Sequence, residues 1–231
     1  MSKTNIKAVI WDLDGTLIHF KIDWLRARRE ALKILRNHGV PKSLLTARNS
    51  ILDNVEKAKE YFKSIKLDPE EVISIFKLVE SSVNEIEYEA ALNATPIDGI
   101  KKVLDFVKSR NLKQAIYTFN TTKNAEISLD KVEFLSYFDV IVGRDQVENA
   151  KPHPEHLSTI CEKLNVNCQE TIVIGDTSRD IEGAMNVQAN SIALKTKLSN
   201  FSNIRVLQKA DVLVKEIDVP EKLIKAIKGF L

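Results

Sequence analysis

Cysteine is scarce in this chain, and the two cysteines present cannot build a disulfide framework. Cys161 falls on an apolar helical stripe, which favours a buried thiol over a metal-binding or redox pair with Cys168. A chain of 231 residues is long enough to bury a hydrophobic core by itself. Stability therefore requires neither disulfides nor a structural metal.

Long apolar runs and blocks of like charge are also absent. No window approaches the about 18 consecutive apolar residues of a membrane span, and the apolar run at the N-terminus is too short for a secretory signal. The 34 basic and 32 acidic residues are spread along the sequence, and the net charge of +2 gives no electrostatic case for nucleic acid or an anionic membrane. We expect a cytoplasmic protein without nucleic-acid or membrane partners, while the oligomeric state cannot be inferred.

Glycine and proline are few, at 7 and 6 residues, so no flexible linker between domains stands out. Hydrophobic residues at 44% and charged residues at 29% are close to the averages for a soluble globular protein. Any hinges must therefore be short, and we expect them near residues 18–22 and 92–97.

Apolar residues follow two different patterns along the chain. A run at Ile6–Trp11 predicts a strand, whereas residues 23–93 show helical spacing only. Helices and short apolar strands then alternate, and we expect strands at 115–118, 140–142, 172–174, 191–194 and 212–214, with helices at 100–110 and 220–230. This alternation predicts an α/β fold with a Rossmann-like parallel sheet, and an all-helical domain inserted after the first strand. The predicted core domain comprises residues 1–18 and 95–231, and the helical domain residues 19–94.

Polar clusters follow the predicted strands, where open parallel sheets bind their ligands. They are Asp12-Leu13-Asp14-Gly15-Thr16, Thr118-Phe119-Asn120, Lys151-Pro152, and Gly175-Asp176 with Asp180. Lys151 is an exception, because it trails its strand by a loop and lies just before the helix that begins near His153.

These clusters suit the chemistry of a phosphate ester. Crowded carboxylates repel one another unless a cation neutralises them, and hard oxygen ligands select Mg²⁺ or a similar ion. Thr118 offers a hydroxyl donor and Lys151 a positive charge for phosphate oxygens. Asp12 can then act as a nucleophile, and Asp14 as a separate acid and base.

Each cluster taken alone is also compatible with a purely structural role. Asp-Gly-Thr is a common turn, Thr118 could cap a helix, and Asp180 could be an acidic residue of a first helical turn. His153 and His156 are most simply surface or first-turn residues. The ordered occurrence of four clusters, each near a strand end, favours a hydrolytic site.

The same clusters resemble the four motifs of the haloacid dehalogenase superfamily, in its phosphoglycolate phosphatase-like branch. Asp12-Leu13-Asp14-Gly15-Thr16-Leu17 resembles motif one, Thr118 motif two, Lys151-Pro152-His153-Pro154-Glu155 motif three, and Gly175-Asp176-Thr177-Ser178-Arg179-Asp180 motif four. The resemblance covers essentially the whole chain, and the helical insert is similar to the cap that follows motif one in that branch. It implies a phosphoric monoester hydrolase.

The resemblance also implies roles for individual residues. Asp12 would form an aspartyl-phosphate and bind Mg²⁺, together with Asp176 and the backbone carbonyl of Asp14, whose side chain would transfer protons. Asp180 would support the metal's waters or Lys151 rather than bind the metal directly. Thr118 and Lys151 would bind the transferring phosphoryl group.

One position departs from the family pattern. The family has Asn directly after the motif-two residue, but this chain has Phe119 there and Asn120 one residue later. Either Asn120 takes that place through a changed loop path, or the contact is missing. The leading hypothesis is a phosphatase acting on a small-molecule phosphomonoester. The alternatives are a phosphomutase of the same superfamily and a catalytically silent binding protein, and the sequence does not identify the substrate.

Overall fold

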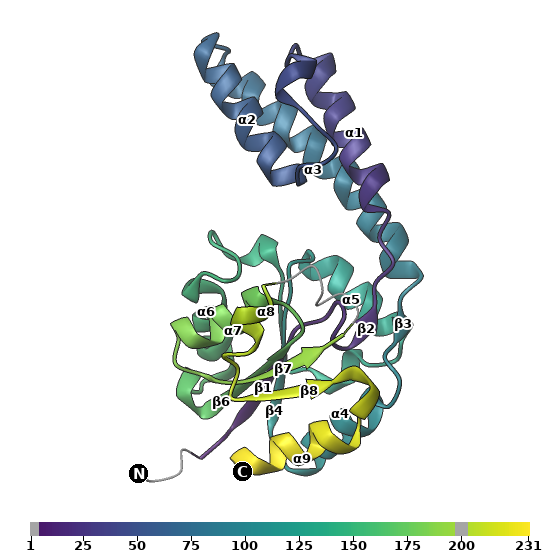
Figure 1. Ribbon diagram of the computed structural model, residues 1–231, viewed down its shortest axis with the longest axis vertical. Coiled ribbons are helices and arrows are strands. Elements are labelled where there is room, and N and C mark those ends of the chain that lie inside the picture. Colours follow the sequence, from purple (N-terminus) through teal and green to yellow (C-terminus); the bar gives the residue numbers. More distant parts are fainter. Residues whose placement is uncertain (1–4, 197–202) are drawn as a thin grey trace. The chain divides into compact units, whose positions relative to one another are not determined.

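The computed structural model describes residues 5–196 and 203–231 (Figure 1). The chain divides into two compact units, Met1–Phe20 with Ala91–Leu231 and Lys21–Ala90. No helix among the described residues is long and apolar enough to cross a membrane.

A six-stranded parallel sheet forms the centre of the first unit, in the order β5-β4-β1-β6-β7-β8. Its strands are β1 (Ala8–Trp11), β4 (Lys113–Tyr117), β5 (Val140–Val142), β6 (Thr171–Gly175), β7 (Asn190–Lys195) and β8 (Val212–Lys215). Each strand lies where the apolar runs predicted one, so the expected α/β fold with a parallel sheet is confirmed.

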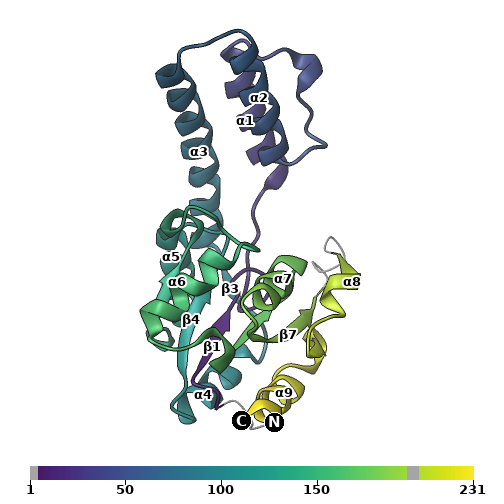
Figure 2. The same ribbon diagram turned by 90° about the vertical axis from the view of Figure 1, so that its left-hand side faces the viewer.

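Helices cover both faces of this sheet. They are α4 (Ile100–Ser109), α5 (Thr122–Lys131), α6 (Pro154–Leu164), α7 (Ser178–Asn186), α8 (Ile204–Leu207) and α9 (Glu221–Phe230), with short 3-10 turns η2 (Leu135–Tyr137), η3 (Arg144–Gln146), η4 (Cys168–Glu170) and η6 (Glu216–Asp218). Side chains alternate along β1, so Val9 and Trp11 pack with α4, α5 and α9, whereas Ala8 and Ile10 pack with α6 and α7. Figures 1 and 2 show α6 and α7 on one side of the sheet and α4 and α9 on the other. Cys161 of α6 is a free, buried thiol, as expected.

A second, very small sheet was not predicted. Strands β2 (Ile18–His19) and β3 (Thr95–Pro96) pair antiparallel, with Ile18 opposite Pro96. Two-residue strands carry no readable periodicity, which explains why the sequence did not indicate them.

The unit Lys21–Ala90 is described throughout and contains helices and turns without a strand. It comprises α1 (Trp24–Asn37), the 3-10 turn η1 (Lys42–Leu44), α2 (Ile51–Ser64) and most of α3 (Pro69–Leu92). Helix α2 begins with a capping box in which Ser50 and Asp53 satisfy each other's backbone N–H groups. The unit has a hydrophobic core of its own, which includes Leu35, Phe62 and Ile75.

Candidate active site

Three neighbouring strands bring the predicted site residues to one edge of the sheet. Trp11, the last residue of β1, lies opposite Ile116 of β4 and Ile174 of β6. Asp12, Thr118 and Asp176 therefore all follow the carboxyl ends of adjacent parallel strands, where their side chains can meet.

Lys151 joins this edge despite its distance from a strand in the sequence. Its Nζ donates to Asp12 Oδ1 at 2.5 Å, to Asp180 Oδ1 at 2.7 Å and to the carbonyl oxygen of Tyr117 at 3.0 Å. The ammonium group also lies 4.6 Å from the centre of the Tyr117 ring. Burial opposes the charged form, but the two carboxylates outweigh it and raise the pKa of Lys151. Lys151 is thus a buried ammonium with a hydrogen-bond acceptor for each of its three N–H groups.

His156 fixes the backbone at Lys151. The N–H of Lys151 donates to His156 Nδ1 at 3.3 Å, and His156 Nε2 lies 2.9 Å from the carbonyl oxygen of Val142. Burial lowers the pKa of His156 to about 4, so the ring is neutral at pH 7, with its proton on Nε2 toward Val142. Of the two expected positions, surface or first turn, His156 has the second, since it belongs to the first turn of α6, and its ring is fully buried against Tyr117. No local spacing in the sequence indicated that this ring would be buried.

Asp12, Asp176 and Asp180 form a buried carboxylate cluster. Each offers one oxygen, and these oxygens lie within 4.8 Å of one another. Burial raises the pKa of Asp12 to about 6 against the opposing charge of Lys151. Burial, with the charges of Asp12 and Asp180, raises the pKa of Asp176 to about 8. Such crowding is unfavourable for the ionised carboxylates without a further cation, so these side chains fit a hard divalent ion.

Within this cluster, Asp180 has other partners for both of its oxygens. Oδ1 accepts from Lys151, and Oδ2 accepts from the backbone N–H of Thr177 at 2.9 Å and from its hydroxyl at 2.6 Å. Asp180 therefore holds Lys151 and the first turn of α7 in place.

Gly15 allows the motif-one loop to pass close to Asp176. Its backbone has a φ of +83°, and its N–H donates to the carbonyl oxygen of Ile18 at 2.8 Å. A Cβ at this position would lie 2.5 Å from Asp176 Oδ2. Glycine is thus required both by the backbone conformation and by the close approach.

Asp14 lies beside the loop that follows β4. Its Oδ2 accepts a hydrogen bond of 2.8 Å from Asn120 Nδ2. Thr118 is buried in the same loop, and its Oγ1 accepts from the N–H of Asn120 at 3.0 Å. The ring of Phe119 points outward, with 38% of the residue exposed, and lies 4.9 Å from the Arg179 guanidinium. The loop path thus brings Asn120 to the inward position that Phe119 leaves, which the sequence alone left open.

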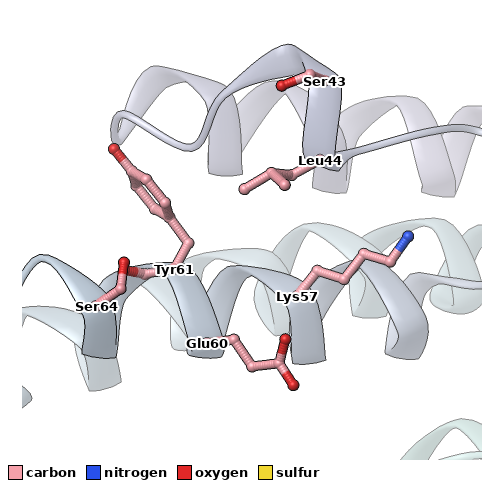
Figure 3. A pocket seen from close by; sticks show the side chains of 6 residues that line it. All are labelled: Ser43, Leu44, Lys57, Glu60, Tyr61 and Ser64. Carbon is pink, nitrogen blue, oxygen red and sulfur yellow. The ribbon is translucent and has the colours of Figure 1, made fainter.

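A hollow in the helical unit is lined by a different set of residues from the predicted site (Figure 3). It lies between η1 and α2 and is lined by Ser43, Leu44, Lys57, Glu60, Tyr61 and Ser64. It has one acidic and one basic side chain, and none of the residues predicted for the site lines it.

Comparisons with known proteins show which family this chain resembles. Residues 9–194 match the family model described as haloacid dehalogenase-like hydrolase. The chain is 27% identical over 226 residues to a phosphorylated carbohydrates phosphatase from Thermotoga maritima, with 98% of this chain and 100% of that protein covered. It is 25% identical over 228 residues to an N-acetylmuramic acid 6-phosphate phosphatase from Pseudomonas aeruginosa, covering 98% of this chain and 97% of that protein.

Solved structures show the same fold. A beta-phosphoglucomutase from Clostridium difficile aligns with a TM-score of 0.66 at 23% identity, covering 97% of each chain. CbbY from Rhodobacter sphaeroides, solved in complex with phosphate, aligns with a TM-score of 0.61 at 18% identity, covering 90% of this chain and 93% of that one. At these identities the likeness establishes the fold alone.

Proposed function

The chain belongs to the haloacid dehalogenase-like hydrolase family, and on this basis we propose that it is a magnesium-dependent phosphatase that hydrolyses a small-molecule phosphomonoester through a phosphorylated Asp12. The family resemblance and the expectation of a hydrolase are confirmed by the family match and by the phosphatase relatives. The observation that carries the finer proposal is the buried contact of Lys151 with both Asp12 and Asp180 beside Asp176. It joins the proposed nucleophile, phosphate-binding cation and cation-binding carboxylate beside the carboxyl ends of β1 and β6.

The proposed roles follow from the contacts of each side chain. Asp12 attacks phosphorus and becomes phosphorylated, while Asp14 protonates the leaving group and then deprotonates the attacking water. Asp12, Asp176 and the backbone carbonyl of Asp14 would hold Mg²⁺, which supplies positive charge to the carboxylates and the phosphate when it is bound. Asp180 holds Lys151 in place rather than binding the metal directly.

Thr118 and Lys151 bind the phosphoryl oxygens in this proposal. Since Thr118 Oγ1 already accepts from the N–H of Asn120, its own proton can be donated to the phosphate. Lys151 has three acceptors already, so a phosphoryl oxygen that binds it must replace one of them. Replacement of Asp12 Oδ1 would free the nucleophile at the moment the substrate arrives.

The substrate class that we propose comes from the names of two relatives. Two relatives are named phosphatases of phosphorylated carbohydrates and of N-acetylmuramic acid 6-phosphate, and a sugar phosphate is therefore the substrate class we propose.

The division into a core domain of residues 1–18 and 95–231 and a cap of residues 19–94 remains a proposal as well. The compact helical unit Lys21–Ala90 supports it.

The test is phosphate release from an aryl phosphate and from a panel of sugar phosphates, with and without Mg²⁺. Asp12→Asn replaces the nucleophilic oxygen by an amide, and activity should fall to background. Asp14→Asn should lose on the order of 10²- to 10⁴-fold, the usual contribution of general acid–base catalysis, and less for good leaving groups. An Asp12→Asn protein that still turns over would exclude the aspartyl-phosphate. Transfer of phosphate between sugar positions that needs a bisphosphate activator, without net release, would identify a phosphomutase instead.

A further inference from the structure

We propose that Asn120 is a positioning residue, which holds the carboxylate of Asp14 in place for proton transfer. This inference rests on the proposed function, because it gives Asp14 the role of acid and base. Its starting point is the hydrogen bond of 2.8 Å from Asn120 Nδ2 to Asp14 Oδ2, which joins residues 106 positions apart in the chain.

The contact is sheltered from water on the side of Asn120. Only 3% of Asn120 is exposed, so its carboxamide is buried against the site. A buried amide donor restricts the rotation of the carboxylate that accepts its hydrogen bond. Because the carboxamide is neutral, it orients Asp14 without supplying a counter-ion, which suits a group that has to give up a proton and take one back.

The backbone of Asn120 is itself held from both sides. Its N–H donates to Thr118 Oγ1 at 3.0 Å, and its carbonyl oxygen accepts from the N–H of Arg144 at 3.0 Å. A Cβ on Gly143 would lie 2.5 Å from that carbonyl oxygen, so glycine permits the close approach of the two loops. The backbone from which the Asn120 side chain reaches Asp14 is thus fixed by contacts with two other residues.

The neighbouring residue explains how Asn120 reaches this position. The guanidinium of Arg144 donates to the carbonyl oxygen of Phe119 at 2.6 Å, and the Phe119 ring contacts Arg179 at the surface. Phe119 is thereby turned outward, and Asn120 turns inward. Thr118, which we propose binds phosphate, and Asp14, the proposed acid, are thus connected through one residue.

The experiment compares Asn120→Ala and Asn120→Leu with the wild type on a series of aryl phosphates whose leaving groups differ in pKa. Both substitutions remove the amide donor without adding a charge beside Asp14, and Asn120→Leu keeps nearly the size of the side chain if the shorter variant does not fold. Each should lower kcat by roughly 10- to 100-fold for poor leaving groups and little for good ones, with KM nearly unchanged, because part of the acid catalysis is lost. Added to Asp14→Asn, neither substitution should cause a further loss.

Thr122→Val is the matched control, at the first residue of α5, two positions after Asn120. The Thr122 hydroxyl contacts Asp145 and the N–H of Gly143, and these contacts support the loop without touching Asp14. This variant should keep the wild-type dependence on the leaving group even where the loop is less stable.

The outcomes separate the two proposals. An equal loss for all leaving groups, a loss that adds fully to that of Asp14→Asn, or wild-type rates in both Asn120 variants would overturn the role of Asn120 while leaving the phosphatase intact. A wild-type protein that releases no phosphate from any ester with Mg²⁺ would overturn the proposed function, and the role of Asn120 with it.

Discussion

At the scale of single residues, two glycines have similar backbones in different surroundings. Gly15 and Gly39 have φ values of +83° and +90°, which disfavour any residue with a side chain. A Cβ on Gly15 would lie 2.5 Å from Asp176 Oδ2, whereas nothing lies within 4 Å of a Cβ on Gly39. The pair therefore separates the effect of backbone strain from the effect of a displaced carboxylate.

We expect Gly39→Ala to lower the free energy of unfolding by about 1–2 kcal/mol and to leave Mg²⁺ affinity and activity unchanged. Gly15→Ala should lose more stability, because Asp176 must also move, and should weaken Mg²⁺ binding and activity together. Denaturant unfolding and magnesium calorimetry on both variants measure this. Equal effects of the two substitutions on magnesium binding would mean that the contact with Asp176 is unimportant.

At the scale of elements, His156 connects β5 to the loop before α6. The contribution of this residue to the free energy of unfolding should depend on pH. Burial lowers the pKa of His156 to about 4, below its ordinary value of 6.5. The unfolded chain therefore gains a proton near pH 6.5 that the folded protein accepts only near pH 4. This contribution to stability is fully present above pH 6.5 and is lost as the pH falls through that window.

His156→Gln should remove that dependence. The wild type is expected to be more stable than the variant at about pH 8, and the difference should shrink by about 1.4 kcal/mol per pH unit below the unfolded pKa. The carboxylates are common to both proteins, so their titration largely cancels in the difference. Chemical unfolding over a pH series is the measurement, with His38→Gln as a control for the loss of an exposed imidazole. A constant difference across the series would contradict the prediction.

Individual strands and loops differ in how well the sequence predicted them. Strand Val140–Val142 was predicted with the observed ends, because a short run of β-branched residues between Asp139 and Gly143 is typical of a strand. The meeting of Asp12 and Asp176 followed from parallel strand ends. The burial of His156 and the contact of Asn120 with Asp14 could not be predicted, because both depend on loop paths that bring distant residues together. Local spacing carries no information about such paths.

At the scale of the whole molecule, the two units have separate hydrophobic cores. Phe62 is 1% exposed in the helical unit and packs against the rings of Tyr61 and Phe76. Leu104 of α4 is fully buried in a core of the other unit. Damage to one core should therefore be detectable without damage to the other.

Phe62→Ala is expected to lower stability by about 3–5 kcal/mol and to speed amide hydrogen exchange in α1, α2 and α3. The amides of the six-stranded sheet should stay protected, and Mg²⁺ affinity should be retained. Leu104→Ala should give the opposite pattern, with faster exchange in the sheet and weaker Mg²⁺ binding. Exchange mass spectrometry follows both, and equal acceleration in both units after either substitution would show that they unfold together.

The position of β1 in the sheet has a consequence for synthesis on the ribosome. Its neighbours β4 and β6 begin at Lys113 and Thr171, and Asp12 meets Lys151 only 139 residues later in the chain. During translation, β1 therefore emerges from the ribosome long before β4 and β6, the strands with which it pairs. The segment Lys21–Ala90, in contrast, is contiguous and has its own core. The helical unit can therefore fold first during translation, while β1 and the adjacent Asp12 are still unpaired. A ribosome stalled before Asp180 emerges would hold a folded helical unit and no assembled site.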